Sequence, residues 1–89
     1  DLYVFVVDLK DGKFKAHGVS PRLVESDGFA LTDPNGKPII RQMADALKAG
    51  DGGELDYAWR NPVTRKVEEK HTRFRKVGDL LVAVGYYTR

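Results

Sequence analysis

Two aromatic residues at alternate positions, Tyr57 and Trp59, are the first candidates for a binding site in this chain. The segment that contains them is typical of a β-strand, and alternate residues of a strand point to the same face. Each side chain combines a large apolar surface with one polar atom. That combination fits the wall of a ligand cavity, and it fits a hydrophobic core beneath a helix equally well.

Two basic residues on the next predicted strand, Lys70 and Arg73, could bind an anion. They are three positions apart and therefore lie on opposite faces, so both enter one pocket only if the strand contains a bulge or a strong twist. An arginine could hold a carboxylate through two parallel hydrogen bonds. The alternative for either residue is an ordinary solvated charge on a strand. His17, at the end of an earlier predicted strand, has the position of a surface or capping group.

Signatures of catalysis and of metal binding are lacking in the sequence. The chain has no cysteine, which excludes disulfides, zinc–thiolate sites and cysteine nucleophiles. Gly50, Gly52 and Gly53 follow the predicted helix instead of preceding one, so they do not form a phosphate-binding loop. The two histidines, His17 and His71, show no metal-ligand spacing with the acidic residues. We therefore expect a protein that is not an enzyme and has no metal and no cofactor.

Length and composition predict a single globular domain over residues 1–89, because 89 residues leave no room for a second core. The chain is 42% hydrophobic and 31% charged, and its net charge is +2. Basic residues concentrate between Arg60 and Lys76, where a basic hairpin would attract anions. No apolar run approaches the roughly 20 residues of a membrane helix. The chain begins without methionine, so we expect any membrane or targeting segment to lie upstream of it.

The elements that position these residues follow from the apolar pattern and the turn residues. The predicted order is β-β-α-β-β-β, with strands over 2–8, 14–17, 54–60, 66–77 and 79–87, a loop over 18–37 and a helix over 38–49. Pro38 suits the first position of the helix and Gly50 its C-terminal cap. The first strand is almost entirely apolar, which predicts burial on both faces. We predict an α+β fold of the PAS-like kind, a five-stranded antiparallel sheet covered on one face by one helix and a long loop.

Several motifs occur in an order that resembles one known family. They are the strand Tyr3-Val4-Phe5-Val6-Val7-Asp8, the turn at Gly12, His17, Pro21-Arg22-Leu23, Asp33-Pro34-Asn35-Gly36-Lys37, the run Tyr57-Ala58-Trp59-Arg60-Asn61-Pro62-Val63-Thr64, Lys70, and Gly85-Tyr86-Tyr87. Together they resemble the single Cache domain of the second type, a family of small extracytoplasmic sensor domains of bacterial chemoreceptors and sensor kinases. The resemblance covers nearly the whole chain.

The resemblance implies a PAS-like fold and a ligand-binding site. The implied site residues are His17, Tyr57, Trp59, Lys70, Arg73 and Tyr86. The family usually has tyrosine at the position of Arg73, and the loop after His17 also departs from the family pattern, with Glu25-Ser26 in place of Gly-Lys. The family's long helix before the first strand is not found in this chain, so we expect either that it lies upstream or that another chain covers its surface. A sheet face without that helix predicts an exposed apolar patch, which a second copy or another chain could cover.

The first functional hypothesis is therefore a periplasmic or extracellular sensing domain for a short carboxylate such as acetate, propionate or pyruvate. Lys70 or Arg73 would supply the cation, Tyr57 and Tyr86 would donate hydrogen bonds, and Trp59 would pack on the alkyl part. The alternative is a PAS-like structural or dimerising module with no small ligand.

Contact between a nucleic acid and the basic hairpin is a third and weaker idea. Glu68 and Glu69 interrupt the basic patch, and we expect no nucleic-acid partner.

Overall fold

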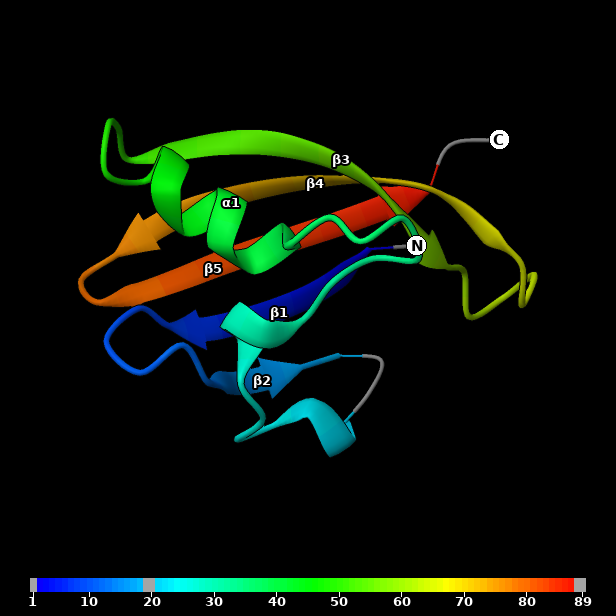
Figure 1. Cartoon of the computed structure of the whole chain (residues 1–89), viewed down its shortest axis with the longest axis horizontal. Coiled ribbons are helices and arrows are strands. Elements are labelled where there is room, and N and C mark those ends of the chain that lie inside the picture. Colours follow the sequence, from blue (N-terminus) through cyan, green and yellow to red (C-terminus); the bar gives the residue numbers. More distant parts are fainter. Residues whose placement is uncertain (1, 19–20, 88–89) are drawn as a thin grey trace.

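The computed structural model describes residues 2–18 and 21–87 of the chain. One five-stranded antiparallel sheet has the strand order β2-β1-β5-β4-β3 (Figure 1). The elements are β1 (Tyr3–Asp8), β2 (Phe14–His17), α1 (Ile39–Ala46), β3 (Gly52–Arg60), β4 (Val67–Val77) and β5 (Leu80–Tyr87), with short 3₁₀ helices over Pro21–Leu23 and Gly28–Ala30. The predicted fold class and element order are confirmed.

Pairing between β1 and β5 brings the two ends of the sequence together in the middle of the sheet. The register runs from Tyr3 opposite Gly85 to Asp8 opposite Leu80. The last three strands form the predicted meander, with β4 paired to both β3 and β5. The turn between β4 and β5 depends on Gly78, whose φ of 59° lies in the left-handed region that favours glycine. The pairing of β1 with β5, which are the first and last strands of the sequence, thus joins the N-terminal hairpin to the C-terminal meander.

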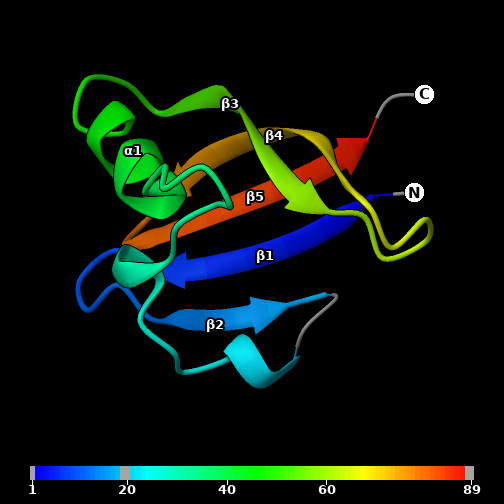
Figure 2. The same cartoon turned by 45° about the vertical axis from the view of Figure 1, so that its right-hand side comes forward.

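The inner face of the sheet is covered by α1 and by the loop that precedes it, as both views show (Figures 1 and 2). Ile39, Ile40 and Met43 are buried against the sheet, which is the spacing of one apolar helix face. They pack with the inward side chains of the strands. These strand residues are Phe5, Val7, Phe14, Tyr57, Phe74, Leu81 and Ala83.

The helix is shorter than predicted at both ends. Pro38 is its N-cap, with a ψ of 83° that is not helical, instead of its first residue. At the other end the N–H groups of Lys48 and Ala49 donate to carbonyls only three residues earlier, at 3.2 Å. Bonds of that kind tighten the chain into turns, so the α-helix ends at Ala46.

The prediction that β1 is buried on both faces is wrong. Phe5 and Val7 point inward and are buried, but Val4 on the outer face is 46% exposed. No described residue of the chain covers that outer face. Several large apolar side chains of the strands and their flanks are exposed, namely Leu2, Val4, Val67, Val77 and Leu80.

Asp33 fastens the loop before α1 to the edge strand β3. Its Oδ1 accepts hydrogen bonds from the N–H groups of Asn35 at 2.9 Å and Lys37 at 2.8 Å, and its Oδ2 accepts from the N–H of Ala58 at 3.3 Å. Burial acts to raise the pKa of Asp33, but the backbone donors outweigh it, so the pKa lies below its usual value. The carboxylate therefore holds the cover of the inner face in place.

Candidate functional site

A small, partly enclosed cavity lies between the inner face of the sheet and its cover. Its free volume is about 10 Å³, roughly the space of one water molecule. The lining comes from β1, β2, the loop, α1, β3 and β4. It consists of Phe5, Phe14, His17, Leu31, Ile39, Ile40, Tyr57, Trp59 and Lys70. Apart from His17 and Lys70, this lining is made of apolar and aromatic side chains.

Lys70 is the charged group of this cavity. It comes from β4 and is only 3% exposed. Its Nζ lies 5.5 Å from the ring centroid of Phe5 and 5.7 Å from that of Tyr57, within the range of cation–π attraction. Lys70 makes no ion pair or hydrogen bond with any other residue that the structure describes. Burial lowers the pKa of Lys70 from 10.5 to about 8, because the charged form loses its water.

Gly85 on β5 makes the space that Lys70 occupies. A Cβ atom at this position would overlap Cε of Lys70 and would lie 3.1 Å from both Lys70 Nζ and Thr72 Oγ1. Gly85 is the β5 residue directly opposite Thr72 on β4. Glycine is therefore required here because of the close approach of a side chain, and the lysine lies across its bare backbone.

Tyr57 places a hydroxyl group in the same region. Thr72 Oγ1 donates a hydrogen bond to Tyr57 Oη at 3.2 Å, which leaves the phenolic proton available for another acceptor. Burial raises the pKa of Tyr57 to about 12, although the bond from Thr72 acts in the opposite direction. The ring meets Trp59 edge to face, with centroids 5.9 Å apart. The phenol thus stays protonated at neutral pH and can donate.

His17 forms another part of the wall. Its ring stacks on Phe5 with centroids 5.8 Å apart and meets the ring of Phe14 edge to face at 5.5 Å. Burial lowers the pKa of His17, and the positive charge of Lys70 lowers it further. The imidazole is therefore neutral at pH 7, and Lys70 supplies the positive charge of the cavity.

The structure brings together four of the six predicted site residues and separates the other two. His17, Tyr57, Trp59 and Lys70 line the cavity. Arg73 and Tyr86 do not line it, because both point to the outer face of the sheet. Arg73 Nε pairs there with Glu54 Oε1 at 2.7 Å, and the Tyr86 ring packs against His71.

The remaining lining residues were not predicted as site residues. They are Phe5, Phe14, Leu31, Ile39 and Ile40. Their only signal in the sequence is apolar periodicity, which does not distinguish a cavity wall from an ordinary core. Gly85 was noted only as part of a terminal motif, and its packing against Lys70 depends on the strand register.

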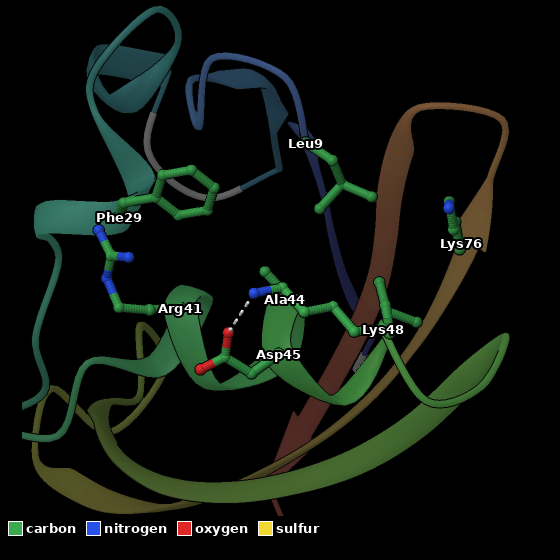
Figure 3. Close-up of a pocket in the computed structure, with 8 residues that line it drawn as sticks. Leu9, Phe29, Arg41, Ala44, Asp45, Lys48 and Lys76 are labelled. Atoms are coloured by element: carbon green, nitrogen blue, oxygen red, sulfur yellow. Dashed lines mark ion pairs between the residues drawn. The ribbon is translucent and has the colours of Figure 1, made fainter.

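A larger and more open cleft of about 330 Å³ lies beside α1, between Leu9, at the end of β1, and Lys76 of β4 (Figure 3). The Arg41 guanidinium carbon lies 5.1 Å from the centroid of the Phe29 ring. Lys48 Nζ lies 3.4 Å from Asp45 Oδ1, and both side chains are mostly exposed. Water screens exposed charges of this kind, so they bind anions weakly. The small cavity with its desolvated cation is the stronger candidate site.

The strand order, the single covered face and the cavity beneath that cover define a PAS-like domain. The chain belongs to the family called Single Cache domain 2, whose model matches residues 1–88. None of the helices in the described part of the chain has the length and apolar character to span a bilayer. A comparison with curated proteins finds no match.

Solved structures similar to this chain include sensor domains of chemotaxis proteins. A methyl-accepting chemotaxis protein from Vibrio parahaemolyticus RIMD 2210633 is 28% identical, with a TM-score of 0.85 over 98% of this chain and 59% of its own. A structure described as the periplasmic sensor domain of a chemotaxis protein is 25% identical, with a TM-score of 0.89 over 100% of this chain and 62% of its own. Both descriptions name chemotaxis proteins, and the second names a sensor domain.

A third structure is described as a Cache chemosensory domain that recognises carboxylic acid. It is 21% identical, with a TM-score of 0.87 over 99% of this chain and 60% of its own. At this identity the likeness shows a shared fold. The chain thus spans between 59% and 62% of the length of these three neighbours.

Proposed function

We propose that this domain is an extracytoplasmic sensor module that binds a short organic carboxylate next to Lys70. The observation that carries the proposal is the buried lysine, which is 3% exposed and has no acidic partner among the described residues. A buried charge without a partner is costly, and a carboxylate is the counter-ion that would offset the cost. The ligand would therefore bring the charge that the protein itself does not supply.

The surrounding groups suit the two ends of such a ligand. The Tyr57 hydroxyl can donate to a carboxylate oxygen near the ammonium group of Lys70. Phe5, Ile39 and Trp59 offer apolar surface for a short alkyl part. Lys70 is the only cation among the described residues that line the cavity, because Arg73 lies on the other face, so a monocarboxylate fits better than a dicarboxylate.

The size of the cavity adds a conformational requirement. The cavity has room for about one water molecule, and even formate, with its three non-hydrogen atoms, is larger than that. Binding therefore requires the cover to move outward, and the cover consists of Leu31 in the loop and Ile39 and Ile40 at the start of α1. A ligand that favours the open arrangement shifts the population of cover positions, which is the kind of change that a sensor transmits.

The family and its structural neighbours support the setting of this proposal. A similar structure is described as a periplasmic sensor domain, and another as recognising carboxylic acid. We propose the same side of the membrane and the same ligand class for this chain. In this proposal the domain belongs to a longer signalling protein, in line with the greater length of its neighbours.

The test is a thermal-shift screen followed by calorimetry, with acetate, propionate and pyruvate against amides, amines, amino acids and purines. Carboxylates should raise the melting temperature in proportion to the logarithm of their concentration, and the matching amides should not. Lys70→Met should abolish the shift. Arg73→Ala is the matched control, because it removes a cation from the same strand but from the opposite face. Loss of the shift in Arg73→Ala but not in Lys70→Met, or no shift with any carboxylate, would contradict the proposal.

A second candidate function is a structural or dimerising module without a small ligand. The apolar outer face favours it, with Leu2 71% exposed and Val4 46% exposed in the middle of the sheet. Light scattering separates the two candidates. A stable dimer that responds to none of the small molecules would favour the structural module.

A further inference from the structure

Three potential metal ligands meet on the outer face of the sheet, away from the cavity. They are Asp56 of β3 and Glu69 and His71 of β4, and their ligand atoms all lie within 4.8 Å of one another. The sequence shows no such cluster, because Asp56 is far from the other two along the chain. The strand register brings it directly opposite His71.

The backbone fixes the relative positions of the three side chains. Glu69 and His71 are alternate residues of one strand and therefore point to the same face. Asp56 lies directly opposite His71 on the neighbouring strand, and Ala58 lies directly opposite Glu69. The fourth position of this group of residues therefore carries only a small side chain. The His71 ring packs on the Tyr86 ring of β5, with centroids 5.3 Å apart, which holds the imidazole in position. Such support from neighbouring side chains is common around metal-ligating histidines.

The distances are close to those of a coordination site. His71 Nδ1 lies 2.9 Å from Asp56 Oδ1, so the pair already shares one hydrogen bond or ion pair. Zn²⁺ bonds of about 2.1 Å at a tetrahedral angle would place these two atoms about 3.4 Å apart. Asp56 is 54% exposed and Glu69 is also exposed, so small side-chain rotations can open the pair and bring the second carboxylate in.

The donor set selects the class of metal. One imidazole nitrogen and two carboxylates suit a borderline divalent transition ion such as Zn²⁺, whereas Mg²⁺ and Ca²⁺ prefer oxygen ligands alone. The local charge is also favourable. Arg73, on the same face, is already paired with Glu54, and Asp56 and Glu69 bring two carboxylates beside the His71 imidazole.

We propose that Asp56, Glu69 and His71 form a binding site for a divalent transition-metal ion of the Zn²⁺ class on the outer face of the sheet. The ion would join the edge strand β3 to β4, and water would fill its remaining coordination position. The site does not depend on the proposed carboxylate function. It uses the opposite face of the same two strands, with Asp56 next to Tyr57 and with Glu69 and His71 on either side of Lys70.

The test is calorimetric titration of the domain with Zn²⁺ alone, with Ni²⁺, Mg²⁺ and Ca²⁺ for comparison. The protein must carry no histidine tag, which would bind the same ions. The variants are His71→Ala, Glu69→Gln and Asp56→Asn, and circular dichroism checks that each one folds. Asp45→Asn is the matched control, since it removes an exposed carboxylate of α1 that lies outside the cluster.

We expect one Zn²⁺ per chain, an increase in melting temperature of several degrees and no response to Mg²⁺. Each of the three variants should weaken Zn²⁺ binding at least tenfold, while Asp45→Asn leaves it unchanged. The proposal is overturned if the domain shows no Zn²⁺ binding, or if Asp45→Asn weakens it. It is also overturned if only His71→Ala has an effect, because that result describes a single surface histidine and not a three-ligand site.

Discussion

Replacing Lys70 by methionine should make the domain more stable while removing its proposed ligand response. Methionine has a similar length and fills the same space without a charge. The pKa of Lys70 is lowered from 10.5 to about 8, which corresponds to about 3 kcal/mol of lost stability at 1.36 kcal/mol per pH unit. The cation–π contacts with Phe5 and Tyr57 offset part of this cost, by roughly 0.5–2 kcal/mol. We therefore expect Lys70→Met to raise the free energy of unfolding at pH 7 by about 1–3 kcal/mol.

The pH dependence identifies the buried charge as the cause. Below pH 8 both the folded and the unfolded wild-type chains hold the Lys70 proton, so the full cost of burial is present. Between pH 8 and 10.5 the unfolded chain binds this proton and the folded chain does not, so wild-type stability rises with pH. The stability difference between Lys70→Met and wild type should therefore shrink as the pH is raised from 7 to 10. Other groups that titrate in this range are common to both proteins and cancel in the difference.

The assay is urea denaturation followed by circular dichroism, performed at each pH on both proteins. An increase of about 1 kcal/mol corresponds to a rise in melting temperature of roughly 4–8 °C in a domain of this size, so the effect is well above experimental error. The reasoning is refuted if Lys70→Met is less stable than wild type at pH 7. It is equally refuted if the difference is the same at pH 7 and pH 10, because the burial of a charge would then not be its cause.

Three further perturbations test the geometry. Gly85→Ala should displace the buried lysine and remove the response to carboxylates, whereas Gly50→Ala, whose Cβ meets no atom within 4 Å, should bind normally in calorimetry. Asp33→Ala removes the hydrogen-bond acceptor that joins the loop to β3. It should therefore lower the melting temperature by several degrees and speed hydrogen exchange at the Ala58 amide. An unchanged exchange rate would contradict that role. Val4→Glu on the outer face should lower any self-association seen by light scattering, and unchanged association would place the interface elsewhere.

Much of the fold could be predicted from the sequence because strand periodicity and turn residues are local properties. The Asp11-Gly12 and Gly78-Asp79 turns locate two hairpins, and the spacing of Ile39, Ile40 and Met43 indicates the helix. The exposure of Val4 could not be predicted in this way. An apolar run predicts which residues avoid water, but whether anything covers them depends on other parts of the protein.

The candidate site was predictable only in part, for a related reason. Residue parity places Lys70 and Arg73 on opposite faces, and the structure confirms this separation. The alternation of residues along a strand does not show which face of the sheet the helix and loop cover. The sequence alone therefore could not decide whether Lys70 or Arg73 is buried. The role of Gly85 and the meeting of Asp56 with His71 depend on the register between strands, which is set by the whole sheet and not by any short segment.

Strand β4 contributes to two different candidate sites because its successive residues point to opposite faces of the sheet. Lys70 is buried in the cavity, where its charge loses the stabilisation of water, while its neighbour His71 is partly exposed beside Asp56. A domain of this size has little stability to spare, and a buried lysine with no counter-ion among the described residues uses about 1–3 kcal/mol of it once the cation–π contacts are included. Such a cost is difficult to explain as packing, since an apolar side chain of the same size would fill the space without it. It is readily explained if the counter-ion comes from outside, because the same unfavourable free energy then becomes the driving force for binding a carboxylate.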